Sequence, residues 1–383
     1  MPLKIAIIGA GLIGPRHAQA AISNSSTELV ALVDPAPSGP AMAARFHTRY
    51  FPSISAMLAA AAAAASDDDE SNFTKPDAAI VCTPNDTHVP VAKDLLSAGI
   101  HVLVEKPLST SVASGLSLLR HAAKPEHSHL KLLVGHHRRF NPYVVKTKEL
   151  VESGSLGRII AVNGLWTLYK PPEYFVPPTE WRRSRAAGGG VILINLIHDV
   201  DVLQYLLGPI VRVHAERTLP SRPNPPHDAE DGAALTLRFA SGAVGTFLVC
   251  DAAPSPHSFE AGTGENPSIP RTGADFYRIF GSEAALSVPD MVRWSYDGRD
   301  AKSWTQPLTV ERIEVSRDIV PLEAQLAHFV DFIEGRAEPR CTGREGLRAL
   351  VVCDAVRRAL ESGMPVEVED VDRMVEERDE VGL

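Results

Sequence analysis

The sequence predicts an α/β protein in which a doubly wound parallel-sheet domain precedes a C-terminal α/β domain with a large, mostly antiparallel open sheet. A chain of 383 residues is long for one domain and favours two. The first third alternates short apolar strands with helices, which is typical of a parallel sheet covered on both faces. After about residue 137 the pattern changes, and from residue 210 to 281 several long strands follow one another without helices between them.

The first domain, residues 1–137, is expected to consist of strands that alternate with helices. Right-handed crossovers between its parallel strands make the sheet doubly wound. The expected strands are 4–10, 28–34, 77–83, 100–106 and 130–136, and the expected helices are 12–25, 53–66, 86–99 and 112–124.

The second domain, residues 138–383, is expected to serve substrate binding and oligomerisation. Residues 240–242, Ala-Ser-Gly, separate two of its strands as a hairpin turn would. The loop at 252–273 is too long for a plain connector and is either a substrate lid or disordered. The expected strands are 158–170, 210–218, 231–240, 243–251 and 275–281, and the expected helices are 142–153, 191–208, 322–335 and 343–362, the last a candidate for packing back on the first domain.

Composition and charge narrow the possible partners. A formal charge of −9 argues against nucleic acid as the main partner. No uninterrupted apolar run reaches the roughly 18–20 residues of a membrane span. The four cysteines form no CxxC pair, so we expect free thiols in the cytoplasm and no zinc or other metal site. Residues 1–20 imitate a signal peptide, but their glycines have a better explanation.

The first strand leads directly into a glycine-rich turn that opens the first helix. Gly9, Gly11 and Gly14 have GxGxxG spacing, with Leu12 and Ile13 between the last two. In a dinucleotide site, the first glycine allows the tight turn, the second lets the backbone approach a pyrophosphate, and the third lets helix and strand pack closely. The segment therefore predicts a Rossmann dinucleotide-binding domain.

An acidic residue supports this prediction. Asp34 follows Gly14 by 20 residues, at the end of the second strand, where a ribose-binding carboxylate belongs. A carboxylate accepts hydrogen bonds from a free ribose 2′-hydroxyl and repels a 2′-phosphate. Residues 35–40 contain no arginine that could neutralise such a phosphate. We therefore expect NAD(H) rather than NADP(H).

Polar residues interrupt an otherwise apolar segment at 191–208. On an α-helix, Asn195, His198 and Asp199 would share one face, because side chains three and four apart are neighbours. Burying such groups unpaired costs roughly 1–3 kcal/mol each. They therefore need partners, water or a ligand, and the segment alone is compatible with a satisfied core histidine.

Several motifs together resemble the glucose–fructose oxidoreductase / inositol dehydrogenase (Gfo/Idh/MocA) family. Besides GxGxxG, they are CTPNDTH at 82–88, VEKPL at 104–108 and AGGGVILINLIHDVD at 187–201. The resemblance covers nearly the whole chain and includes VGHHRRFNP at 134–142 and the segment 342–368.

The resemblance implies a site with the nicotinamide between the two domains, near Lys106 and the helix that carries His198. It also implies that the open sheet of the second domain joins subunits, so we expect a homodimer or homotetramer. Beyond the glycine turn and Asp34, the implied cofactor contacts are Thr83, Pro84, Asn85, His88, Glu105, Lys106 and Arg182.

The sequence departs from the family pattern at one position. In many members the helix reads GGG-x3-Asp-x-Gly-x-His. Here His198 matches, but Ile194 occupies the Asp position and Leu196 the Gly position. We expect Asn195 to offer a neutral hydrogen bond to a substrate hydroxyl instead.

The chemistry expected of this site is hydride transfer between nicotinamide and a secondary alcohol. His198 would take the hydroxyl proton, and Lys106 would stabilise the developing alkoxide. Acid–base catalysis of this kind raises the rate by a factor of roughly 10²–10⁴. The substrate would be a cyclic polyol, a sugar or a quinate-like ring hydroxy acid. Two alternatives stay open, a non-catalytic NAD-sensing transcriptional regulator and an NAD-dependent glycosidase.

Arginine and aromatic residues bear on the substrate. Arg139 and Arg182 lie in HHRRF and EWRRSR, and the arginine fork suits carboxylates and phosphates. They form either ion pairs and cofactor contacts or a site for a substrate carboxylate. Tyr169 and Trp181 could supply apolar walls for a ring.

Overall fold

A computed structural model describes residues 1–64, 73–177, 179–222 and 227–376 of the chain. These residues divide into two compact units. The first unit combines Met1–Phe140, Ile319–Leu347 and the described part of Val371–Leu383, and the second combines Asn141–Asp318 and Arg348–Asp370.

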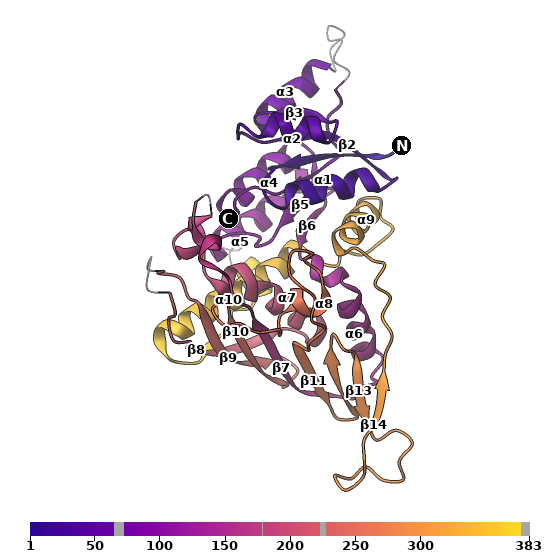
Figure 1. Ribbon diagram of the computed structural model, residues 1–383. Coiled ribbons are helices and arrows are strands. Elements are labelled where there is room, and N and C mark those ends of the chain that lie inside the picture. The colour runs from indigo at the N-terminus through magenta and orange to yellow at the C-terminus, as the bar shows by residue number, and fades with distance from the viewer. Residues whose placement is uncertain (65–72, 178, 223–226, 377–383) are drawn as a thin grey trace. The chain divides into compact units, whose positions relative to one another are not determined.

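In the described residues, the first unit contains a six-stranded, wholly parallel sheet, as the alternating pattern predicted (Figure 1). Its order is β3-β2-β1-β4-β5-β6. The sequence pattern missed β3, which has only three residues and therefore shows no periodicity. The strands are β1 (Leu3–Ile8), β2 (Thr27–Val33), β3 (Arg49–Phe51), β4 (Ala78–Val81), β5 (His101–Glu105) and β6 (Leu132–Gly135).

Helices connect these strands and bury apolar residues of the sheet. Ile5, Ile7, Leu32, Ile80 and Leu103 from four strands form the core of the unit. The helices are α1 (Gly14–Ser23), α2 (Gly39–Arg45), α3 (Ile54–Ala64), α4 (His88–Ser97), α5 (Val112–Ala122) and α11 (Val371–Glu376).

A late helix also belongs to this unit, contrary to the predicted boundary at residue 138. Helix α9 (Pro321–Ile333) contacts α1, and its Leu326 and Phe329 are fully buried in the core of the first unit. Helix α10 (Gly343–Ser362) changes unit at Arg348. Sequence order alone could not reveal this, because an apolar helix face does not specify which sheet it covers.

The second unit contains, within the described residues, a nine-stranded sheet of order β14-β13-β12-β11-β7-β10-β9-β8-β15. Among its described strands only β7 and β10 pair in parallel, so the predicted mostly antiparallel sheet is confirmed. The strands are β7 (Ile159–Thr167), β8 (Ile210–Arg217), β9 (Gly232–Phe239), β10 (Val244–Cys250), β11 (Tyr277–Gly281), β12 (Ala284–Val288), β13 (Val292–Ser295), β14 (Thr309–Arg312) and β15 (Val366–Glu367).

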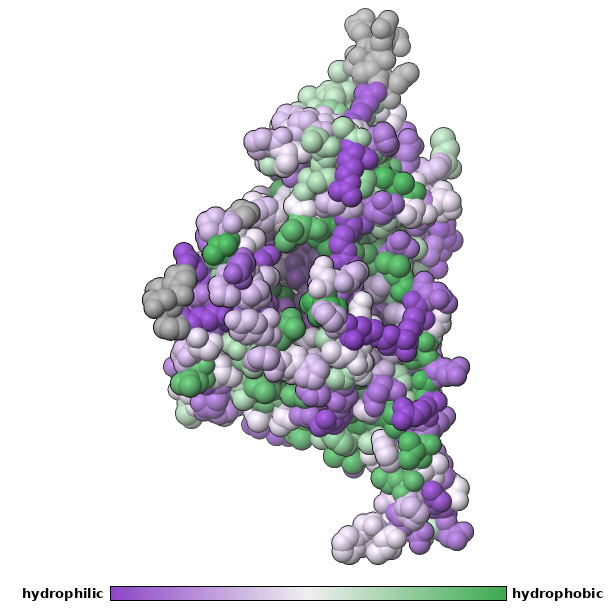
Figure 2. All heavy atoms as spheres, in the orientation of Figure 1, coloured by the Kyte–Doolittle hydropathy of each residue, from purple (hydrophilic) through white to green (hydrophobic). Residues whose placement is uncertain are grey.

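Helices cover one face of this sheet, which explains the alternating burial along β9 (Figure 1). They include α6 (Pro142–Glu152), α7 (Ile197–Leu207) and the later part of α10. The other face exposes large side chains such as Val244, Phe280 and Trp294. Figure 2 shows apolar side chains among polar ones over the second unit, including the surface beside β13 and β14.

The long loop at 252–273 is packed rather than disordered. Ser258 caps the short helix α8 (Phe259–Thr263) by accepting a hydrogen bond from the backbone N–H of Ala261. Phe259 is fully buried, and its ring centroid lies 4.9 Å from that of Phe276. The disordered alternative is therefore wrong. Among the described residues, no helix is long and apolar enough to cross a membrane.

Candidate active site

The glycine turn has the geometry that a dinucleotide site needs. Gly9 has a φ of +98°, and a Cβ there would lie 2.7 Å from the carbonyl oxygen of Cys82. A Cβ on Gly14 would lie 2.2 Å from the carbonyl oxygen of Gly9, so helix and strand could not pack as they do. Gly11 has open space at this position, and Leu12 beside it is 80 % exposed. The turn therefore leaves its backbone accessible to a bound phosphate.

Asp34 is anchored to this turn. Its Oδ2 accepts a hydrogen bond from the backbone N–H of Ala10 at 2.5 Å, and its Oδ1 accepts one from Ala36 at 2.7 Å. Each carboxylate oxygen keeps a further lone pair for a ligand hydroxyl. The sequence predicted the residue but not these contacts, which hold the carboxylate beside the turn.

The loop after β4 contains Thr83, Pro84 and Asn85 and leads into α4. His88, at the start of α4, is 1 % exposed, and its two ring nitrogens lie 2.8 Å from the carbonyl oxygen of Pro107 and 2.9 Å from that of Thr83. The pKa of His88 is lowered because burial disfavours the charged ring. The ring thus lies between the loops that carry Thr83 and Pro107.

Glu105 ends β5 beside Lys106 and forms a buried ion pair. Its Oε1 lies 2.7 Å from Nε2 of His17, a residue of α1 that is 1 % exposed. Burial by itself would raise the pKa of Glu105, but the hydrogen bond and charge of His17, with the charges of His137 and Lys106, hold it at about 2. This pair links the helix of the glycine turn to the strand that presents Lys106.

Arg139, a predicted substrate-binding residue, is buried and has protein partners. The side chain is 2 % exposed within the first unit. It donates to Oε1 of Glu345 at 2.8 Å and to the carbonyl oxygen of Arg340. Arginine in a polar sequence motif suggested a ligand, but here the guanidinium joins the end of β6 to α10. The ion-pair alternative therefore describes Arg139.

In the second unit, the segment that opens α7 is not a continuous α-helix. Residues Ile192–Leu196 form a π-helical turn, and the α-helix begins at Ile197. A π turn bonds each residue to the fifth along the chain, so the α-helical spacing predicted for Asn195 and His198 does not apply. Such turns are frequent at functional sites.

The buried polar residues of this segment have separate surroundings. Asn195 Oδ1 accepts a hydrogen bond from Nζ of Lys170 at 2.6 Å. Asp199 is fully buried and accepts one from the hydroxyl of Tyr277 at 2.5 Å. His198 lies between them in sequence and is 6 % exposed.

Four charged residues behind Asn195 were not predicted. Lys170 Nζ lies 3.3 Å from Asp251, and Arg222 bridges Asp251 and Asp231 at 2.5 and 2.8 Å. We call Lys170, Asp251, Arg222 and Asp231 the charge cluster. The sequence contained a sign of two members of the charge cluster, because Lys170 and Asp251 are charged residues that each follow an apolar strand. Only the parallel pairing of β7 with β10 shows that these strand ends meet.

Arg182 lies in the second unit, as do the predicted aromatic residues Tyr169 and Trp181. The guanidinium carbon of Arg182 is 3.8 Å from the ring centroid of Tyr174 and 5.8 Å from that of Trp181. Tyr169 is 51 % exposed, and its backbone forms an isolated bridge with Ala252. Arg182 donates to the carbonyl oxygen of Tyr174 at 3.2 Å, and it contacts no carboxylate of the described residues.

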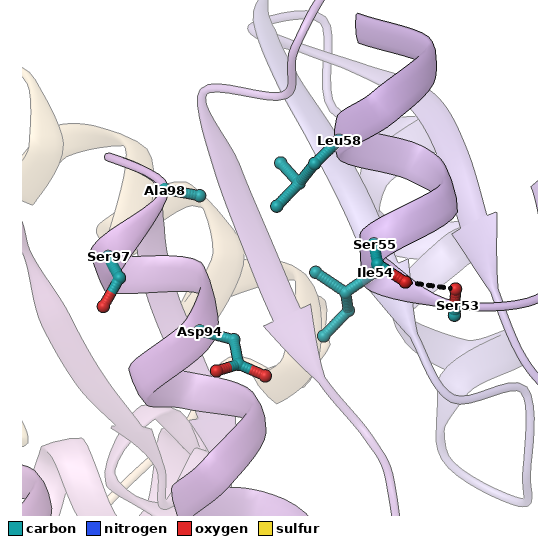
Figure 3. A pocket seen from close by; sticks show the side chains of 7 residues that line it. All are labelled: Ser53, Ile54, Ser55, Leu58, Asp94, Ser97 and Ala98. Carbon is teal, nitrogen blue, oxygen red and sulfur yellow. Dashed lines mark hydrogen bonds between the residues drawn. The ribbon is translucent and has the colours of Figure 1, made fainter. Parts of the chain in front are cut away.

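A separate hollow in the first unit is lined by other residues. It has a volume of about 560 Å³ and opens widely to solvent between α3 and α4 (Figure 3). Its lining contains none of the predicted cofactor residues. The lining residues are Ser53, Ile54, Ser55, Leu58, Asp94, Ser97 and Ala98. No cluster of His, Cys, Asp and Glu among the described residues could hold a metal ion.

Comparisons with known proteins agree with this architecture. The model of the oxidoreductase family's NAD-binding Rossmann fold (GFO_IDH_MocA) matches residues 3–136. The model of the same family's C-terminal alpha/beta domain matches residues 148–368.

Similar proteins cover nearly the whole chain. An inositol 2-dehydrogenase of Rhizobium meliloti (strain 1021) is 25 % identical over 363 residues, which are 94 % of this chain and 97 % of that protein. The WlbA dehydrogenase from Bordetella pertussis, solved with NADH and UDP-GlcNAcA, has a TM-score of 0.74 at 24 % identity and covers 96 % and 99 % of the two chains. An oxidoreductase from Agrobacterium radiobacter, solved with NAD⁺, L-tartaric acid and magnesium, has a TM-score of 0.76 at 17 % identity and covers 98 % and 100 %.

The buried Glu105 pair predicts a pH-dependent stability. A carboxylate whose pKa is lower in the folded state stabilises the fold above its unfolded pKa, near 4.5, and this share is lost as the pH falls toward about 2. Between pH 6 and pH 3, the free energy of unfolding in urea should fall by about 2 kcal/mol less in Glu105→Gln than in the unaltered protein. Glu28→Gln, at an exposed position of β2, is the matched control. An equal loss in Glu105→Gln and the unaltered protein would refute the role of the pair.

Proposed function

The chain belongs to the Gfo/Idh/MocA family of oxidoreductases and is an NAD(P)-dependent dehydrogenase or reductase acting on CH–OH groups, and we propose that it transfers hydride between NAD(H) and a secondary alcohol of a cyclic polyol, sugar or hydroxylated ring acid. The observation that carries this proposal is the set of buried hydrogen-bonding groups at the start of α7. The surrounding residues are apolar core residues, so polar groups at this point suit a polyhydroxylated ligand.

The residues of the first unit fit the dinucleotide. The backbone of the glycine turn would hold the pyrophosphate beside Leu12 and Ile13, and Asp34 would accept ribose hydroxyls. Thr83, Pro84 and Asn85 would flank the nicotinamide side. The bound nicotinamide supplies the hydride acceptor or donor.

Three side chains would perform the remaining chemistry. His198 takes the proton of the substrate hydroxyl, because an imidazole can change its charge near neutral pH. Lys106 stabilises the alkoxide with its ammonium group. Asn195 orients a substrate oxygen. His88 would act by joining two loops and Glu105 by joining α1 to β5, and neither would act on the substrate.

Arg182 favours an acidic substituent among the possible substrates. Its guanidinium rests on aromatic rings and contacts no carboxylate of the described residues. A planar guanidinium binds carboxylates by two parallel hydrogen bonds. The relatives named above include an inositol dehydrogenase and a structure with L-tartaric acid, which supports both a polyol and a hydroxy acid.

The proposal is tested by measuring NADH formation with a panel of cyclitols, sugars, sugar acids and quinate-like acids. We expect turnover of at least one polyhydroxylated ring compound. Turnover excludes a non-catalytic NAD-sensing regulator. Release of sugar from a glycoside without net NADH formation would instead identify an NAD-dependent glycosidase, and no reaction with any compound would overturn the proposal.

Substitution of the two reacting residues should lower turnover and spare cofactor affinity. Lys106→Met and His198→Ala should each reduce kcat by roughly 10²–10⁴, because alkoxide stabilisation or proton transfer is lost. The Kd of NADH, measured by fluorescence titration, should change little, since the glycine turn and Asp34 hold the dinucleotide. An active His198→Ala enzyme would return this histidine to a purely structural role.

Asp34 should decide between the two cofactors. NAD⁺ should bind more tightly than NADP⁺, because the anchored carboxylate repels a 2′-phosphate. Asp34→Ala should narrow this difference in calorimetric titrations. Tighter binding of NADP⁺ to the unaltered protein would show that the argument from Asp34 is wrong.

The open face of the nine-stranded sheet should bind a second subunit. Val244 and Phe280 are 52 % and 40 % exposed there, and both line a hollow of about 580 Å³. Large exposed apolar patches are uncommon on monomers. Light scattering should report a dimer or tetramer, and Val244→Glu should weaken it. A monomer at micromolar concentration would contradict this prediction.

A further inference from the structure

Lys170 is a buried lysine in the second unit that the proposed chemistry does not use. It follows β7 and is 6 % exposed. A buried ammonium group is costly unless its three N–H donors find partners. The role of Lys170 can therefore be inferred from the groups that its ammonium contacts.

Strand pairing places Lys170 beside its counter-ion. Because β7 and β10 run parallel with Thr167 opposite Cys250, Lys170 and Asp251 leave the sheet at the same edge. The backbone N–H of Lys170 donates to the carbonyl oxygen of Asp251 at 2.9 Å, and its Nζ lies 3.3 Å from the carboxylate. Both residues are therefore held by backbone as well as by charge.

The rest of the charge cluster keeps Asp251 in place. Arg222 donates to Asp251 and to Asp231, so two cations and two carboxylates neutralise one another. Asp251 is 3 % and Asp231 is 8 % exposed. A buried ion pair whose members are all satisfied is rigid, because any displacement leaves a charge without its partner.

The second hydrogen-bonding partner of the Lys170 ammonium group is Asn195. The ammonium group carries only donors, so the atom 2.6 Å from Nζ must be the amide oxygen of Asn195 and not its nitrogen. The ammonium group accepts no hydrogen bond, so the amide nitrogen keeps both of its N–H donors for other groups. That nitrogen donates to no described residue and is not sealed from solvent.

We propose that Lys170 is a positioning residue that fixes the amide of Asn195 with its N–H donors toward the substrate. The substrate half of the site is then specific for an oxygen that accepts a hydrogen bond, such as a hydroxyl, carbonyl or carboxylate oxygen. Without Lys170 the amide can rotate and present either its oxygen or its nitrogen. This inference rests on the proposed contact between Asn195 and the substrate.

A double-mutant cycle tests the coupling between Lys170 and Asn195. Steady-state kinetics use the panel compound with the fastest NADH formation, at saturating NAD⁺. Lys170→Met and Asn195→Ala should each raise KM about tenfold, the effect of one lost hydrogen bond, and change kcat less than threefold. The double variant should be no worse than Asn195→Ala alone, because Lys170 acts only through Asn195.

Matched variants separate positioning from folding. Lys170→Arg keeps a donor-only cation and should retain most of the affinity. Asn195→Asp keeps a partner for Lys170 and should melt like the unaltered protein, yet it offers no N–H donor and should raise KM at least as much as Asn195→Ala. Lys146→Met, in an exposed ion pair of α6, is the control for the Lys-to-Met change.

The same cycle is measured by calorimetric binding of myo-inositol and of L-tartrate to the NADH complex, which requires no turnover. Additive effects in the cycle, or an unchanged KM in Lys170→Met, would overturn the role of Lys170 while the proposed function stands. A non-additive binding cycle without turnover of any compound would overturn the proposed reaction and keep the role of Lys170. Neither binding nor turnover would overturn both.

Discussion

The parallel pairing of β7 with β10 places Lys170 against Asp251, and the polar part of the second unit depends on this contact. Charged groups can be buried only where their partners are already in position. The strand pair supplies that position through the backbone, and Arg222 and Asp231 complete the neutral cluster. Asn195 can then be a polar residue in an apolar segment at little cost.

The first unit also buries charged groups, and it does so with fewer residues. His17 on α1 and Glu105 at the end of β5 form one buried pair, and Asp34 accepts two backbone N–H groups. Both arrangements connect the glycine turn to strand ends of the parallel sheet. A rigid turn matters here because backbone N–H groups can bind phosphate only if their directions are fixed.

In the proposed function, the two units therefore differ in how they would recognise a ligand. The first would use mainly backbone geometry and one carboxylate, which suits a cofactor of constant structure. The second would use side chains such as Asn195 and Arg182, whose identity can change without altering the fold. A family that shares the first arrangement can therefore act on diverse alcohols.

The local sequence pattern was sufficient to predict the features that depend on neighbouring residues alone. The positions of Gly9 and Gly14 follow from steric limits on the backbone, and Asp34 follows from its distance along the chain to the next strand end. The parallel sheet and most long strands follow from apolar periodicity. The strands β12 to β14 were not predicted, because they are short and carry exposed residues on one face.

Tertiary structure alone decided which distant residues meet. The sequence could not show that Arg139 pairs with Glu345, that both ring nitrogens of His88 face backbone carbonyl oxygens, or that α9 joins the first unit. It also could not place Lys170 beside Asn195, because these residues meet through a strand pairing and a π-helical turn. Hydrogen bonds and ion pairs depend on distances of a few ångströms, and sequence spacing determines such distances only within one helix or strand.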